Sequence, residues 1–283
     1  MINAPHFVAL AHFDLDRAGV QDAMLDVLRE EIAFVEEWVK HELRQMDGSH
    51  DWWHIHRVRN NALAIARKEG PGGLGGLDPA FDIVVELAAL VHDVQDWKYS
   101  GDPDAGTRAI ARDVAGMIRT ITDVYPDVLK RVLNVVQGVG FKDELGDELG
   151  EAKKSKKASP SDLPLELKVV QDADRLDAIG AIGIGRTFCY GGAKGHAMHV
   201  PGVEPRKRLT RAEYVGDAKT KKRKTEKTVD ATRVDTTVNH FHEKLLKLRG
   251  LMKTETGRAM AEKRHARMVE FLEAFHEEWE GEE

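Results

Sequence analysis

Residues 78–94 read DPAFDIVVELAALVHDV, and this stretch decides the class of fold. Asp78 and Pro79 are typical of the N-cap and first turn of a helix. The body that follows is apolar almost all round, which is typical of a helix at the centre of a core. It ends in His92-Asp93, two polar groups whose burial is costly unless they are paired or bind a ligand. The stretch predicts a central helix with a chemically unusual end.

The rest of the chain also predicts helices. Apolar residues recur in steps of three and four over residues 18–45, the signature of one long amphipathic helix. A second helix is expected to run through His54 to about Lys68. The other expected helices cover about 103–120, 125–137, 163–177, 179–189, 236–252 and 255–280. No alternating strand of convincing length is present, so we expect an all-α fold in which residues 1–46 pack on a domain of residues 47–283.

Composition bounds the class of protein. Of the 283 residues 42% are hydrophobic and 32% are charged, as in a soluble globular protein. The formal charge of −6 argues against a dedicated nucleic-acid binder. No apolar run approaches a membrane span, and the first residues do not resemble a secretory signal. The single Cys189 excludes an intrachain disulfide and fits a reducing compartment, so a cytoplasmic location is expected.

Two stretches are expected to be flexible, solvated insertions. Residues at about 142–162 and 202–231 are charged and nearly devoid of large apolar groups. The second contains KKRK, which is either a nuclear address or simply part of a solvated loop. The glycine-rich PGGLGG at 71–76 could be a phosphate loop, but it lacks the Lys-Ser/Thr of that motif and follows a helix. A flexible connection is the better interpretation.

Residues 169–177, VVQDADRLD, place three carboxylates on an apolar helix. Asp174 and Asp177 are three residues apart and can share one face, whereas Asp172 faces elsewhere. Like charges in a half-buried place repel, and a divalent cation is the usual means of reconciling them. The alternative is a salt-bridged surface helix on which Arg175 and Lys168 supply the cations.

Histidines gather in SHDWWHIHRV, residues 49–58. The spacing alone leaves a metal site, a polar surface and satisfied core histidines all open. His92-Asp93 is equally open, since both groups could cap neighbouring turns at a helix end. Imidazole and carboxylate ligands without cysteine favour Mn, Fe, Mg, Co or Zn, and the nitrogen ligands favour a transition metal.

The ordered set of His54 in the context His-x-x-Arg-Val, then His92-Asp93, then Asp174 resembles the HD superfamily of metal-dependent phosphohydrolases. The resemblance runs through most of residues 47–280. It is strongest for a bacterial branch marked by SHDWWHIxRV, ELAALVHDVxDWK, VVQDADRLDAIGAIGI and NHFxEKLLKL. Members of that branch hydrolyse nucleoside triphosphates, including deoxy forms, to monophosphate and pyrophosphate. The two charged insertions depart from the compact family pattern.

The resemblance implies that His54, His92, Asp93 and Asp174 hold one divalent ion. Manganese is the expected ion, with Mg²⁺, Co²⁺, Fe²⁺ and Zn²⁺ as alternatives. Two imidazoles and two carboxylates would leave positions open for water and a phosphate oxygen. His56 lies about 160° around the helix from His54 and is expected to be a core or surface histidine.

Further roles are assigned around this ion. Asp96 is expected to act on water as the general base, with Asp177 as a second catalytic candidate and Asp172 as another rival. Lys98 and Arg175 are candidates for contacting phosphate, although Lys98 could be merely exposed and Arg175 could brace the helix.

His50-Asp51 stands at a helix start, where Asp51 can cap the helix and His50 can reach the substrate at the mouth of the site. We therefore expect a small phosphorylated substrate, a nucleotide in particular, with neither nucleic acid nor membrane as partner. A homodimer is left open. The alternative function is an HD-type phosphodiesterase or nucleotidase that acts on another phosphorylated molecule.

Overall fold

The computed structural model describes residues 17–44, 51–71, 78–94, 105–140, 162–206 and 235–282. These residues form helices, and their only strand-like pairing is an isolated bridge between Ala197 and Thr236. The all-α prediction is confirmed for this part of the chain. Most of the two predicted insertions, residues 142–161 and 207–231, lie outside it. The helices are α2 (Arg17–Glu42), α3 (Trp52–Glu69), α4 (Pro79–Val91), α6 (Ala105–Met117), α7 (Arg119–Val124), α8 (Val128–Val139), α9 (Leu165–Asp177), α10 (Gly180–Lys194), α12 (Thr237–Glu243), the 3-10 helix η4 (Leu245–Leu251) and α13 (Glu255–Glu280).

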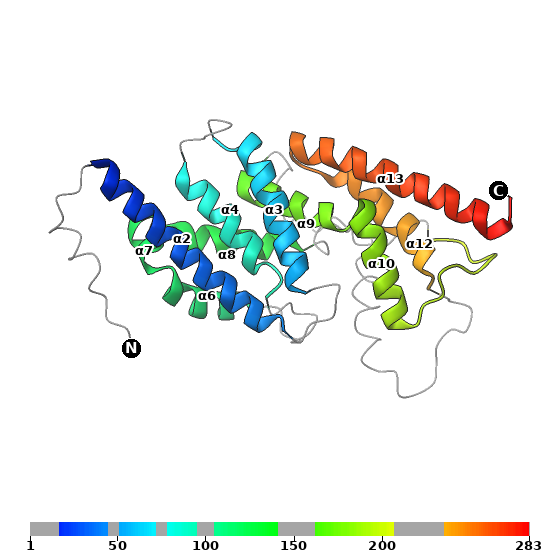
Figure 1. Cartoon of the computed structure of the whole chain (residues 1–283), viewed down its shortest axis with the longest axis horizontal. Coiled ribbons are helices and arrows are strands. Elements are labelled where there is room, and N and C mark those ends of the chain that lie inside the picture. Colours follow the sequence, from blue (N-terminus) through cyan, green and yellow to red (C-terminus); the bar gives the residue numbers. More distant parts are fainter. Residues whose placement is uncertain are drawn as a thin grey trace, which may run out of the picture.

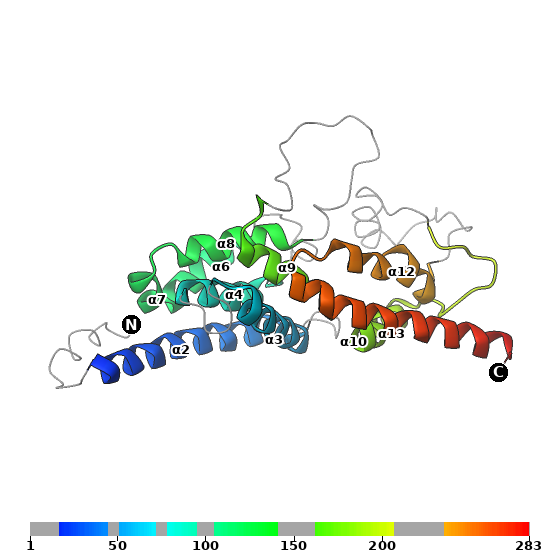
Figure 2. The same cartoon turned by 90° about the horizontal axis from the view of Figure 1, so that it is seen from above.

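The molecule is elongated, with α3 and α9 at its middle (Figure 1). Helices α2, α4, α6, α7 and α8 lie on one side of this pair, and α10, α12 and α13 lie on the other. Figure 2 shows the same order along the long axis, with α2 and the C-terminal end of α13 at opposite ends. Helix α3 packs on both α4 and α9, and α9 also packs on α10 and α13. The two middle helices therefore join the halves.

Helix α4 is the centre of the core, as its apolar sequence predicts. The carboxylate of Asp78 accepts a hydrogen bond from the backbone N–H of Phe81 at 3.1 Å, and Pro79 occupies the first turn. Both expectations for this helix start are confirmed. Nearly every residue of α4 that follows is buried, including Val84, Val85 and Leu87. The helix ends at Val91, three residues before the predicted end, and residues 92–94 form a turn.

Helix α2 covers the core with one face. Its buried side chains follow the predicted steps of three and four residues and are Leu28, Ile32, Val35 and Val39. They pack against α4, α6 and α7. Glu31 accepts hydrogen bonds from the backbone N–H groups of Thr120 (2.7 Å) and Ile121 (2.9 Å) and so caps α7. This cap explains why the helix predicted over 103–120 is interrupted at Ile118 and restarts as α7.

The helix predicted over 236–252 is wrong as a single element. It is divided at Lys244 (φ −132°, ψ −60°) into α12 and η4. Side chains three residues apart share a face of a 3-10 helix, and Leu245 and Leu248 are both buried there. None of the described helices combines the length and the apolar character that crossing a membrane requires.

A buried carboxylate attaches α13 to α9. Asp172 accepts hydrogen bonds from the backbone N–H groups of Lys253 (2.9 Å) and Thr254 (2.7 Å) and from the Thr254 hydroxyl (2.7 Å). Thr254 in turn caps α13 by accepting from the N–H of Gly257 at 2.9 Å. A β-carbon at Gly257 would lie 2.4 Å from Oδ2 of Asp172, so this junction requires glycine.

Candidate metal centre

His54 lies in the first turn of α3, where the helix packs on α4 and α9. The carboxylate of Asp51 caps this helix by accepting a hydrogen bond from the backbone N–H of His54 at 3.0 Å. The predicted cap is therefore confirmed. The cap fixes the position at which α3 begins, and hence the direction in which the buried imidazole of His54 projects between the three helices.

His92 and Asp93 lie just beyond the C-terminal end of α4. A helix end leaves backbone carbonyls without intrahelical partners, and Nδ1 of His92 donates a hydrogen bond to the carbonyl oxygen of Ala89 at 2.9 Å. A carbonyl can only accept, so the proton of a neutral His92 is on Nδ1 and Nε2 presents a lone pair. That Nε2 is buried, and no hydrogen-bond partner for it is present among the described residues.

The structure brings the four predicted ligands together from three helices or helix ends. One ligand atom from each of His54, His92 and Asp93 lies within 4.8 Å of the others, and Nε2 of His54 is 3.3 Å from Oδ2 of Asp93. Oδ1 of Asp174 lies 3.6 Å from Nε2 of His54 and 3.9 Å from Nε2 of His92. Two imidazole nitrogens and two carboxylates thus surround one point, although the sequence separates them widely.

This cluster fits a divalent cation. A buried nitrogen lone pair without a donor is costly, and a cation would satisfy Nε2 of His92. The side chains of His54 and His92 are 2% and 1% exposed, whereas those of Asp93 and Asp174 are 18% and 33% exposed. The cluster is therefore closed on the imidazole side and open on the carboxylate side, as a site that must admit a substrate requires.

Electrostatics at the cluster are strongly perturbed. Burial alone would lower the pKa of His54, but hydrogen bonds to Asp177 and Asp93 raise that pKa to about 9. Burial alone would raise the pKa of Asp177, but hydrogen bonds from His54 and Arg57 and the charge of Arg186 bring it well below its ordinary value. The pKa values of the two partners thus shift in opposite directions, as in a strongly coupled carboxylate–imidazole pair.

Of the other predicted site residues, the structure describes Asp177 and Arg175. Asp177 lies against Nδ1 of His54, on the ring edge away from the carboxylates of the cluster. Arg175 is buried, which favours the interpretation of a brace within the fold over that of a phosphate ligand. The remaining predicted site residues lie outside the described part of the chain; they are His50, Asp96 and Lys98.

Two predictions about neighbouring residues can be compared with the structure. Asp172, the rival catalytic candidate, binds the start of α13 and not the cluster. His56 contacts the rings of Trp52 and Trp53 and lies 3.1 Å from the amide of Asn60, outside the cluster as expected.

Sequence reasoning missed two arginines beside the cluster, Arg57 and Arg186. Arg57 comes one helical turn after His54, and that spacing in His-x-x-Arg was the only signal that it would share a partner with the histidine. Arg186 comes from α10, and nothing in its local sequence indicates its proximity to α3. Both guanidinium groups bind Asp177.

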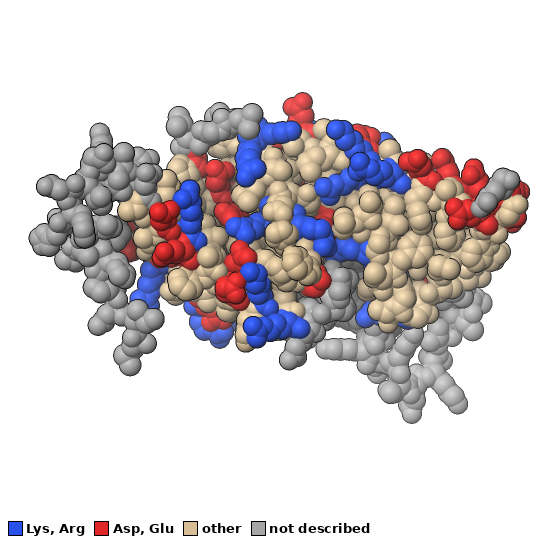
Figure 3. Space-filling view, in the orientation of Figure 1, with Lys and Arg blue, Asp and Glu red and all other residues tan. Residues whose placement is uncertain are grey.

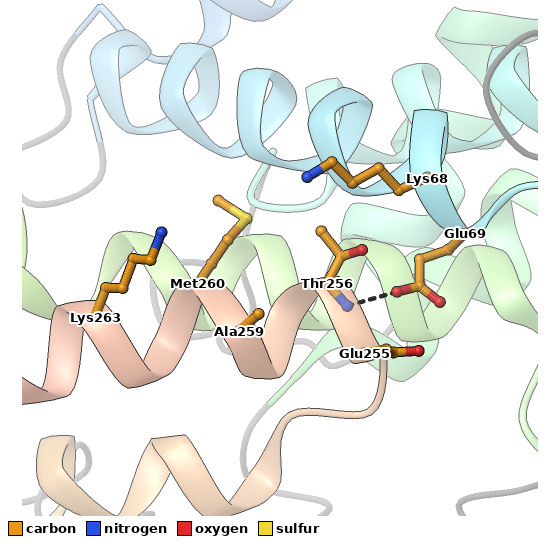
Figure 4. A pocket seen from close by; sticks show the side chains of 7 residues that line it. All are labelled: Lys68, Glu69, Glu255, Thr256, Ala259, Met260 and Lys263. Carbon is orange, nitrogen blue, oxygen red and sulfur yellow. Dashed lines mark hydrogen bonds between the residues drawn. The ribbon is translucent and has the colours of Figure 1, made fainter.

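A separate hollow lies between the end of α3 and the start of α13 (Figure 4). Lys68 and Lys263 flank it, and the backbone N–H of Thr256 at its base donates a hydrogen bond to Glu69. That helix N-terminus is thus already occupied by a carboxylate of the chain itself. None of the predicted site residues that the structure describes lines this hollow.

Comparison with known proteins gives a family. Residues 52–179, which run from the start of α3 to the second residue after the end of α9, match the family model of the HD domain. The Bacillus subtilis protein YpgQ is 32% identical over 235 residues, which cover 83% of this chain and 87% of that protein. Residues 52–179, which the family model matches, contain all four predicted ligands.

Solved structures agree in fold over nearly the whole chain. An HD-superfamily hydrolase from Bacillus thuringiensis is 33% identical with a TM-score of 0.59, over 89% of this chain and 98% of that one. A protein from Lactobacillus plantarum is 29% identical with a TM-score of 0.62, over 89% and 97%. Bacillus subtilis YpgQ in complex with ADP is 27% identical with a TM-score of 0.54, over 87% and 97%.

Proposed function

This chain belongs to the HD domain family of metal-dependent phosphohydrolases, and on that premise we propose that it hydrolyses nucleoside triphosphates, ribo or deoxy, to monophosphate and pyrophosphate. The proposal rests on one observation: the side chains of His54, His92, Asp93 and Asp174 surround a single site. The two carboxylates of this site are partly exposed, so it is accessible from their side. A phosphate chain can approach such a site without displacing the buried imidazoles.

A nucleotide is the substrate class that the relatives support. The YpgQ structure in complex with ADP is of a protein whose fold matches this chain over 87% of its length. The charge of the surface agrees with an anionic ligand. Lys and Arg side chains lie over the middle of the molecule, interspersed with Asp and Glu, and they gather over the first half of α13, whereas Asp and Glu gather at the C-terminal end of that helix (Figure 3). A basic surface raises the local concentration of phosphates.

His54, His92, Asp93 and Asp174 would hold the divalent ion, for which Mn²⁺ is proposed. Such an ion supplies Lewis acidity, which polarises a phosphoryl oxygen and acidifies water. The chain itself fixes both imidazoles by their Nδ1 hydrogen bonds, and it keeps water from the side of the cluster that the histidines close.

Three further residues are proposed to move protons or to bind phosphate. Asp96 follows Asp93 by three residues and is proposed as the general base. Lys98 and His50 are proposed to contact the substrate phosphates. A turnover defect in Asp96→Asn with metal binding retained would support the first role, and a raised KM in Lys98→Ala or His50→Ala would support the second.

Product analysis tests the function. The full chain is incubated with Mn²⁺ and the four ribo and four deoxy triphosphates, ADP, and bis(p-nitrophenyl) phosphate, and the products are separated by ion exchange. Monophosphate with pyrophosphate supports the proposal. Orthophosphate indicates a phosphatase or nucleotidase, and cleavage of the diester alone indicates a phosphodiesterase; either result overturns the triphosphate proposal. His92→Ala and Asp93→Ala are the negative controls, because a contaminating enzyme would be unaffected by them.

A further inference from the structure

Asp177, the last residue of α9, is buried where α3, α9 and α10 meet. Its Oδ2 accepts hydrogen bonds from Nδ1 of His54 at 2.8 Å, from Nη1 of Arg186 at 2.8 Å and from Nη2 of Arg57 at 3.1 Å. Its Oδ1 accepts from Nε of Arg57 at 2.6 Å. Both carboxylate oxygens are therefore committed to donors of the protein.

This geometry does not suit a general base. A base must present an oxygen within hydrogen-bond reach of the proton that it removes from water or substrate. Asp177 is 1% exposed, and it lies behind the imidazole of His54, on the opposite edge of the ring from Asp93 and Asp174. The chemistry that Asp177 can perform is therefore exerted through His54.

We propose that Asp177 is a positioning residue that holds His54 with its proton on Nδ1, so that Nε2 presents its lone pair to the cation site. A carboxylate can only accept, and so it selects this tautomer of the neutral imidazole. The carbonyl of Ala89 does the same for His92. Both histidines are thereby oriented with Nε2 toward Asp93 and Asp174. The inference rests on the proposed function in that it assumes a metal at this site.

The two arginines make this role possible. Arg57 binds both oxygens of Asp177 from α3, and Arg186 binds Oδ2 and also the main-chain oxygen of Asp177 (3.2 Å) from α10. Two guanidinium groups balance the charge of this carboxylate and immobilise it. Asp93 and Asp174 are then the anionic groups left to face the ion, and Asp177 does not compete for it.

Asp177→Asn is the direct test, because the amide has the shape of the carboxylate but replaces one of the two accepting oxygens by an NH2 group, which only donates. Loss of such a partner of a metal-ligating histidine costs about 10–100-fold in metal affinity, and we expect that loss for Mn²⁺ by isothermal titration calorimetry. Excess Mn²⁺ should recover turnover, the KM for the nucleotide should be unchanged, and Asp177→Glu should regain part of the affinity. Asp172→Asn is the matched control, since Asp172 is buried on the same helix but binds α13; it should lower the melting temperature and leave Mn²⁺ affinity unchanged.

A folded Asp177→Asn protein that binds Mn²⁺ as tightly as the wild type would overturn the proposal. If that variant does not fold, the protonation of His54 in the wild type tests the proposal instead. In protein labelled with ¹⁵N-histidine and loaded with Zn²⁺, long-range ¹H–¹⁵N spectra should show His54, assigned with His54→Ala, protonated at Nδ1. Protonation at Nε2 would refute it. Neither readout needs turnover, so wild type that binds Mn²⁺ but cleaves no nucleotide overturns the proposed substrate alone, and wild type that binds no divalent ion overturns both.

Discussion

Nδ1 of His92 and the carbonyl oxygen of Ala89 form a 2.9 Å hydrogen bond that ends α4 and aims the imidazole at the same time. The bond gives a partner to one of the carbonyls that a helix end leaves unsatisfied. It also leaves Nε2 of His92 buried with a lone pair and no hydrogen-bond partner among the described residues. The His92 side chain therefore both gives a partner to a carbonyl at the end of α4 and presents Nε2 as a candidate metal ligand.

His92→Ala should therefore abolish stabilisation by metal. At about 100 times its dissociation constant, Mn²⁺ adds about 2.7 kcal/mol to the free energy of unfolding of a protein that binds it only when folded. We expect this increment in the wild type and its absence in the variant, as measured by urea unfolding with and without Mn²⁺. His56→Ala removes a histidine of α3 that lies outside the cluster, two residues after His54, and it should retain the full increment. An unchanged increment in His92→Ala would contradict the site.

The four candidate ligands could be predicted because their chemistry contrasts with their surroundings. A His-Asp pair after ten mostly apolar residues, and three aspartates on an apolar helix, each require an explanation such as a cation. The partners of His54 could not be predicted in this way. Asp177 was recognised as unusual, but its role depends on Arg186, which approaches from another helix, and one sequence carries no information on that packing.

The fold was predictable where one periodicity persists. The apolar steps of α2 and the capped, apolar α4 are confirmed within a few residues. The division of residues 237–251 into α12 and η4 was not predicted, because Leu245 and Leu248 suit either helix type in sequence. The interruption at Ile118 depends on a carboxylate of α2, Glu31, and local sequence cannot reveal such a distant cap.

Asp172→Ala should destabilise the protein without reaching the metal site. The change leaves the buried N–H group of Thr254 and the partly buried N–H group of Lys253 without their acceptor, and the loss of a buried partner costs about 1–3 kcal/mol. Chemical unfolding should show a decrease of this order, while Mn²⁺ affinity is maintained. Asp123→Ala, at an exposed position on α7, should change stability by less than about 0.5 kcal/mol. Equal losses in the two variants would refute the anchoring role of Asp172.

Two glycines of α10 should respond oppositely to alanine. A β-carbon at Gly183 would lie 2.3 Å from the carbonyl oxygen of Ala178, so Gly183→Ala must displace backbone and should cost about 1–3 kcal/mol. Gly185 has open space around it, and Gly185→Ala should stabilise the helix by about 0.5–1 kcal/mol. Thermal unfolding of the pair gives the comparison. A loss of stability at both positions would contradict the open space around Gly185.

Acidification should destabilise the protein through His242. Burial first, and then the positive charge of His276, lower the pKa of His242 below 6.5, although Glu243 opposes the shift. Below pH 6.5 the unfolded chain therefore binds this proton more readily than the folded protein does, so stability falls as the pH falls through that range; above it both states are neutral and His242 contributes nothing. His242→Gln should accordingly lose less melting temperature than the wild type between about pH 7.5 and pH 5.5. His41→Gln, at an exposed position on α2, should follow the wild type, and parallel curves for all three proteins would show that burial of His242 has no consequence for stability.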